Sequence, residues 1–183
     1  MKKRDMVKGI VVLIAVTVFS GYLLAQVYKV AQPKIEEQKR IEEERLNKEI
    51  FPEGVSFAKE KIKGLTCTAV YDSQTAKLNG EENLVGRIFD IRVPGYGGSI
   101  MVKAGIDREM KIRSIRISDH TETPGLGSKI TERNFLNQFN GTEAPSMYLK
   151  KDSPAGKIDG VTGATISSRA VTDGIRQLQE QLK

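Results

Sequence analysis

The sequence predicts an α+β protein with one N-terminal transmembrane helix followed by a domain in which helices flank an antiparallel sheet. Three observations support this fold class: an uncharged apolar run near the N-terminus, short β-branched segments in the middle, and an amphipathic stripe at the C-terminus. The length of 183 residues suits one ordinary domain plus an appendage.

The first element is the apolar run at residues 9–28, which contains no charged side chain. A helix of about 20 residues reaches about 30 Å, the thickness of a bilayer's hydrocarbon core. The alternative is a cleaved signal peptide, whose apolar region is typically shorter, about 7–15 residues. The run therefore favours a retained anchor that crosses the lipid bilayer once.

The basic residues around this run bear on its orientation. Residues 1–8 include Lys2, Lys3, Arg4 and Lys8, although further basic residues follow the run and nearly balance the count. Basic residues favour the cytoplasmic side, and a long C-terminal domain can be translocated regardless of its charge. We expect residues 1–8 to be cytoplasmic and the C-terminal domain to be extracytoplasmic, on the inner or plasma membrane.

Residues 29–54 form the second element, which we interpret as a polar stalk helix. The segment 34–48 is dense in strong helix formers, and Pro52 and Gly54 end it. The net charge of +6 (29 Lys and Arg minus 23 Asp and Glu) includes +3 from residues 1–8 alone. Because no basic stripe with interleaved aromatics stands out elsewhere, nucleic-acid binding is not expected.

Residues 55–183 form the domain. Strands are predicted at residues 84–93, 100–106 and 110–118, which are rich in β-branched residues. A helix is predicted over 128–139 with Ser128 as its N-cap, then a strand and a terminal helix. The terminal helix is marked by an apolar stripe at helical spacing, formed by Val171, Ile175, Leu178 and Leu182.

The ligand-forming residues are scarce. One His and one Cys exclude an intramolecular disulfide, a Cys-ligated iron–sulfur cluster and a protein-built zinc site of three or four N/S ligands. We expect no metal site and no catalytic acid–base pair. Any redox chemistry must then come from a bound organic cofactor or from a partner.

The segment 159–168 joins a glycine-containing turn, rich in hydroxyl side chains, to the start of the terminal helix. Free N–H groups and the positive end of the helix dipole suit an anion, best a phosphate. Ordinary capping by Ser or Thr explains the same residues equally well. Neither a P-loop nor a dinucleotide-binding glycine fingerprint is present.

Residues 159–165, DGVTGAT, resemble the D-x-x-[ST]-G-A-[ST] flavinylation motif of FMN-binding domains. In that family a flavin transferase moves FMN from FAD onto the hydroxyl of the last Ser or Thr. The resemblance implies covalent FMN on Thr165, with Thr162, Gly163 and Ala164 shaping the turn. Ser167 is a further potential hydrogen-bond donor to the cofactor.

Another segment, ETPGLG at residues 122–127, resembles a loop that lies against the flavin in the same family. The resemblance implies that Glu122, Thr123 and Leu126 contact FMN, whereas on residue type alone they could simply cap and turn a loop. GYGG at residues 95–98 resembles a turn of these proteins and is weaker evidence by itself.

Together with the anchor, these motifs are similar to the G subunits of Rnf complexes, the ion-translocating ferredoxin:NAD oxidoreductases, and to the related C subunits of sodium-translocating NADH:quinone reductases. The resemblance implies an electron-transfer subunit whose partners are the flavin-bearing D subunit, other membrane subunits and, during maturation, the flavin transferase. Two alternatives remain: a stand-alone flavinylated carrier outside the cytoplasm, and an anchored binding or structural module without flavin.

Overall fold

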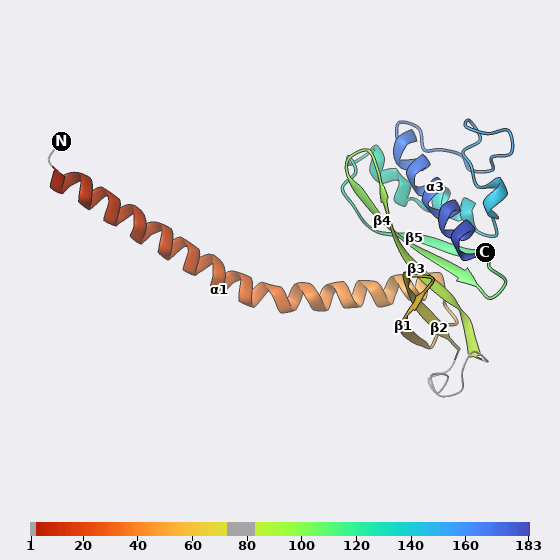
Figure 1. Cartoon of the computed structure of the whole chain (residues 1–183), viewed down its shortest axis with the longest axis horizontal. Helices are drawn as coiled ribbons and strands as arrows, with labels where there is room; N and C mark the ends of the chain where they lie inside the picture. The colour runs from red at the N-terminus through yellow and green to blue at the C-terminus, as the bar shows by residue number, and fades with distance from the viewer. Residues whose placement is uncertain (1–2, 73–82) are drawn as a thin grey trace. The chain divides into compact units, whose positions relative to one another are not determined.

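The computed structural model describes residues 3–72 and 83–183 (Figure 1). Part of the predicted cytoplasmic segment 1–8 and part of the predicted domain 55–183 therefore lie outside the described residues. The chain divides into two units, 1–44 and 45–183. The second unit is α+β, with a five-stranded antiparallel sheet and helices, as the sequence predicts.

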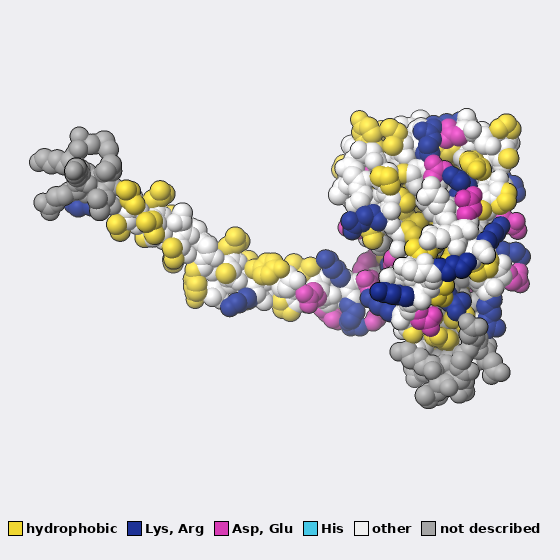
Figure 2. Space-filling model, viewed as in Figure 1, with side chains coloured by type: hydrophobic (Ala, Val, Ile, Leu, Met, Phe, Trp, Pro, Cys, Tyr) yellow, Lys and Arg dark blue, Asp and Glu magenta, His cyan; other side chains and the backbone are white. Residues whose placement is uncertain are grey.

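A single long helix, α1 (Lys3–Ile50), contains both the apolar run and the charged segment, with Pro33 inside it. It is long and apolar enough to cross a membrane, with a mean hydropathy of 2.3 in its most apolar window. Figure 2 shows hydrophobic side chains along this part of the helix. Leu24, for example, is 70% exposed. Further along, Arg40 pairs with Glu37 at 2.7 Å, one turn away, so the polar part of α1 carries ion pairs typical of a solvated helix.

The sheet is a meander in which each strand pairs with the next along the chain. Its strands are β1 (Ser56–Ile62), β2 (Leu65–Tyr71), β3 (Leu84–Pro94), β4 (Ser99–Asp107) and β5 (Ile112–His120). The strands predicted from residue 84 onward are confirmed. The hairpin β1–β2 was not located from the sequence; its two turn residues, Lys63 and Gly64, both have positive φ, as a tight hairpin turn requires.

The terminal helix α3 (Thr165–Leu182) packs on one face of the sheet. Its predicted stripe is confirmed, because Val171, Ile175, Leu178 and Leu182 are all buried in the main core. Alternate residues of β4 form the sheet side of this core: Ile100, Val102, Ala104 and Ile106. Burial of the stripe fixes α3 along its length and so fixes where its first residue lies.

The helix predicted over 128–139 is wrong as a single element. The structure has instead the 3₁₀ helix η3 (Gly127–Thr131), a short helix α2 (Arg133–Leu136) and the 3₁₀ helix η4 (Asn137–Phe139). Ser128 lies inside η3, whose N-cap is Leu126. Ile130 and Phe135 are both buried, and an ideal helix would turn them about 140° apart. The extended backbone at Glu132 breaks the helix, and both side chains reach the core.

The strand expected between these helices and α3 is also absent from the described structure. That region contains the 3₁₀ helix η5 (Ala144–Ser146) and one isolated bridge between Leu149 and Ile158. Both bridging residues are buried, so their apolar side chains anchor a loop to the core rather than extend the sheet.

The other face of the sheet receives the end of α1. Ile50 and Phe51 are 1% exposed and lie over Gly105. Glu49 adds an ion pair, because the Arg116 guanidinium donates to its carboxylate at 3.0 Å. That hydrogen bond, together with the charge of Arg116, holds the pKa of Glu49 below its usual value.

Gly105 leaves no room for a side chain, which yields a stability prediction. A Cβ atom there would lie 2.2 Å from Ile50 Cγ2. We expect Gly105→Ala to lower the free energy of unfolding by about 1–3 kcal/mol, the usual cost of overpacking. Thermal unfolding of the full chain in detergent, followed by circular dichroism, measures it.

The control is the double variant Gly105→Ala/Ile50→Ala, which removes the clashing Cγ2. Its loss of stability should be smaller than the sum of the two single losses, because the residues are in contact. Strictly additive losses would show that contact with Ile50 is not the reason why a side chain at position 105 destabilises the protein.

Candidate functional site

An open pocket of about 270 Å³ lies between the loop after β5 and the start of α3. It brings together seven of the eight site residues expected from the sequence: Glu122, Thr123, Leu126, Gly163, Ala164, Thr165 and Ser167. Thr162 does not line it; this exposed residue lines a neighbouring hollow together with Thr165. Thr165 thus lies where the two hollows meet.

Glu122 is the buried polar centre of the pocket, with only 5% of its surface exposed. The Ser167 hydroxyl donates to its Oε2 at 2.7 Å, and the Gly97 backbone N–H donates to its Oε1 at 3.1 Å. Among the described residues no cation pairs with this carboxylate. Its position depends on neutral donors from the β3–β4 turn and from α3, which it links together.

Glycines make room for that carboxylate. A Cβ atom on Gly95 would lie 2.1 Å from Glu122 Oε1, and one on Gly127 would lie 2.4 Å from its Oε2. The GYGG turn therefore has a definite role: it closes over Glu122 and donates one of its amides. His120 supports the same loop, because its Nδ1 accepts the Glu122 backbone N–H at 3.2 Å.

The start of α3 carries no side-chain cap. Its N-cap residue is Ala164, and the backbone N–H groups of Thr165, Ile166 and Ser167 have no partner within the described part of the chain. Ser168 braces the turn below, because its hydroxyl accepts the Val161 N–H at 2.9 Å and donates to the Ala164 carbonyl at 2.8 Å. Capping by hydroxyl side chains is thus not what the Ser and Thr residues here do, and the positive end of the helix stays open.

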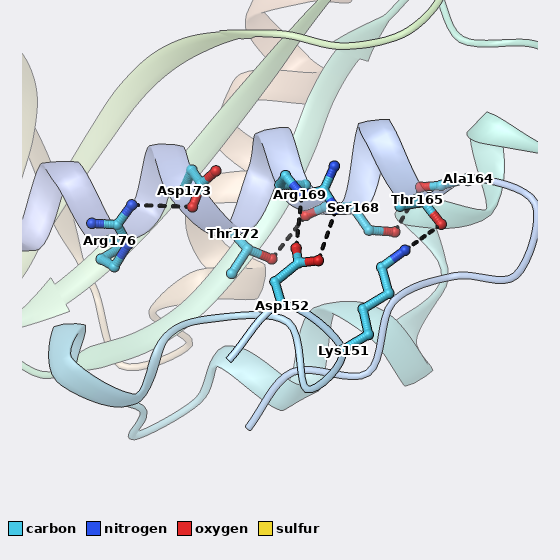
Figure 3. Close-up of polar contacts among 9 residues, drawn as sticks. All are labelled: Lys151, Asp152, Ala164, Thr165, Ser168, Arg169, Thr172, Asp173 and Arg176. Carbon is cyan, nitrogen blue, oxygen red and sulfur yellow. Dashed lines mark hydrogen bonds and ion pairs between the residues drawn. The ribbon is translucent and has the colours of Figure 1, made fainter. Parts of the chain in front are cut away.

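Thr165, half-buried, presents its hydroxyl at this helix end. Its Oγ1 accepts a hydrogen bond of 2.7 Å from Lys151 Nζ (Figure 3). Lys151 is not among the residues predicted from the sequence, because nothing in its spacing indicates that a loop would return it to the helix. The motif residue Asp159 does not face the hydroxyl; it pairs with Lys150 at 2.6 Å.

Large apolar side chains surround the pocket mouth while remaining exposed to solvent. Tyr96 is 73% exposed, and Leu126 and Ile166 are each 50% exposed. Such side chains suit contact with a flat apolar ligand or a partner surface. No cluster of three metal-ligating side chains occurs among the described residues.

The comparisons with known proteins give a family for the segment that contains this pocket. Residues 95–180 match the family described as the FMN-binding domain. This segment runs from the GYGG turn through α3 and includes every residue of the pocket.

The whole chain also has relatives. It is 30% identical over 196 residues to the G subunit of an ion-translocating oxidoreductase complex from Shewanella piezotolerans, covering 96% of this chain and 88% of that protein. It is 38% identical over 89 residues, 48% of each chain, to the G subunit of the proton-translocating ferredoxin:NAD(+) oxidoreductase complex of Clostridium ljungdahlii. The crystal structure of Shewanella oneidensis NqrC aligns with a TM-score of 0.48 at 16% identity, covering 70% of this chain and 67% of that one. The chain belongs to the family of G subunits of ion-translocating oxidoreductase complexes.

The bond between Ser167 and Glu122 yields a prediction for the site. Ser167→Ala removes the hydroxyl donor from a buried carboxylate oxygen, so we expect the free energy of unfolding to fall by about 1–3 kcal/mol. Ile166→Ala, next to it but half exposed, should change stability by no more than about 0.5 kcal/mol. Thermal unfolding of both variants measures this; equal losses would mean that the hydroxyl does not hold Glu122.

Proposed function

We propose that this chain carries FMN as a phosphoester on Thr165 and transfers electrons within a membrane-bound, Rnf-type ferredoxin:NAD oxidoreductase complex. One observation carries the proposal: the Thr165 hydroxyl lies at the uncapped start of α3, where free amides and a pocket with an apolar mouth meet. When bound, FMN supplies the capacity to accept and release electrons.

The residues present fit this cofactor. The amides of residues 165–167 and the Lys151 ammonium would hold the phosphate, because both favour negative charge. The exposed side chains of Tyr96, Leu126 and Ile166 would contact the face of the flavin ring. Glu122, fixed by Ser167 and Gly97, would offer an oriented carboxylate beside that ring.

The attachment step requires a flavin transferase and FAD. The Thr165 Oγ1 attacks the phosphorus of the FMN half of FAD, the pyrophosphate P–O bond breaks, and AMP leaves. The threonine proton passes to a base on the transferase. No oxidation or reduction accompanies this transfer, so the modified chain receives oxidised flavin.

Electron transfer is a task for the complex rather than for this chain alone. The Clostridium relative is named for a complex that uses ferredoxin and NAD(+). The flavin-bearing D subunit is the expected electron partner, and ferredoxin and NAD would bind to other subunits. The open mouth of the pocket suits such a carrier, since an exposed flavin edge lets a partner approach without substrate-binding machinery.

The domain is proposed to face outward from the inner or plasma membrane, with residues 9–28 as the span. The membrane helix supports anchoring, and the basic residues before it support an N-terminus inside. Glu132→Cys places a thiol at an exposed position, whereas Cys67, the native thiol, is buried. We expect a membrane-impermeant maleimide to label this variant in intact right-side-out vesicles. Labelling only after detergent treatment would place the domain inside.

The covalent link is tested on protein from native membranes that contain the transferase. Trypsin should release residues 158–169, which contain the whole motif. We expect this peptide to carry one FMN by mass spectrometry, Thr165→Ala to lose it, and Thr165→Ser to keep it because the hydroxyl remains. An unmodified wild-type peptide would contradict the proposal and favour the module without flavin.

A further inference from the structure

The loop that carries Lys151 is fixed at its base. Leu149 and Ile158 are 1% and 0% exposed and form a bridge. The Lys150 N–H donates to the Ile158 carbonyl at 2.9 Å, and the Asp152 N–H donates to the Leu149 carbonyl at 2.9 Å. These contacts give the loop a defined shape from which the Lys151 side chain extends.

Asp152, the next residue, attaches the same loop to α3. The Arg169 guanidinium donates to both oxygens of its carboxylate, from Nε at 2.7 Å and from a terminal nitrogen at 2.8 Å (Figure 3). These hydrogen bonds and the charge of Arg169 keep the pKa of Asp152 below its usual value. Arg169 lies four residues after Thr165, one helical turn along the same face. The two-pronged ion pair therefore ties the loop to the helix that bears Thr165.

Lys151 and the preceding Lys150 have different hydrogen-bond partners. Lys150 pairs with the Asp159 carboxylate at 2.6 Å. Lys151 instead donates to the neutral Thr165 hydroxyl at 2.7 Å, and no carboxylate of the described residues lies within ion-pair distance of it. An ammonium that forms no ion pair and already contacts the acceptor oxygen suits an incoming phosphate.

We infer that Lys151 acts directly on the Thr165 oxygen and on the phosphate attached to it, and that Asp152 and Arg169 are positioning residues that hold Lys151 in place. The inference rests on the proposed function. As the threonine proton leaves, the ammonium stabilises the negative charge that develops on Oγ1, and afterwards it neutralises the phosphodiester. The amides at the start of α3 would meet the phosphate on its other side.

The rate of flavin attachment tests this role. The full-length chain, produced without the transferase and purified in detergent, is mixed with purified flavin transferase and FAD. Attached flavin is followed by its fluorescence on denaturing gels and by intact-protein mass. Lys151→Met should slow attachment about tenfold, the effect of losing one charge-assisted hydrogen bond at a partly exposed site. Lys151→Arg should restore most of the rate.

Lys157→Met is the matched control, because it removes the same charge from an exposed position on the same loop. It should react at the wild-type rate. An unchanged rate for Lys151→Met, or an equal fall for Lys157→Met, would overturn the inference while leaving flavin on Thr165 intact. Failure of the wild-type chain to acquire flavin would instead overturn the proposed function, and this inference with it.

The ion pair is tested by a double-mutant cycle. Arg169→Gln should slow attachment in the wild-type background but cause no further slowing in the Lys151→Met background, because a residue that acts through Lys151 has no effect without it. Thermal unfolding of each variant accompanies the rates. Additive losses in the cycle would show that Arg169 acts independently of Lys151 and would overturn that half of the inference.

Discussion

The packing of α3 on the sheet is the constraint on which the site depends. Its buried stripe, which includes Val171 and Ile175, has one register against β3 and β4, so the first turn of the helix has one position. That turn presents three amides without a capping side chain, beside the Thr165 hydroxyl. The burial of α3 against the sheet thus determines where the start of this helix can bind a negatively charged group.

The same helix end is joined to two loops by polar contacts of different kinds. Ser167 reaches the buried Glu122 on one side, where a carboxylate without a cation relies on neutral donors. Arg169 reaches Asp152 on the other side through an exposed, bidentate ion pair. Thr165 lies between them, so the flavin site in the proposed function would have a buried, hydrogen-bonded carboxylate on one side and a lysine on the other.

Periodicity and motifs predicted the parts of this arrangement that depend on local sequence. The apolar spacing of α3 and the β-branched strands from residue 84 are local signals, and both are confirmed. The prediction of one helix over 128–139 was wrong because the burial of both Ile130 and Phe135 requires a break in the helix, which helix propensity does not encode. Most of the pocket residues follow from the two motifs, and their roles toward the flavin stay predictions.

Lys151 and the placement of Gly95 against Glu122 could not be predicted, since each depends on a contact between segments distant in sequence. A lysine in a polar loop looks like any solvated residue until the fold returns it to a helix. The hydroxyl residues at 165–168 were ambiguous for the same reason: only the geometry distinguishes a cap from a free helix end.

The junction between α1 and the sheet has a practical consequence for anyone who isolates the soluble part. Ile50 is the last residue of α1 and Phe51 follows it. Both pack closely against the sheet, Ile50 on Gly105 and Phe51 on Gly86 and Gly105. A fragment cut at residue 55 would lose these side chains and expose apolar strand surface, which promotes aggregation. The natural place to shorten the chain is therefore ahead of Arg45, where the second compact unit begins.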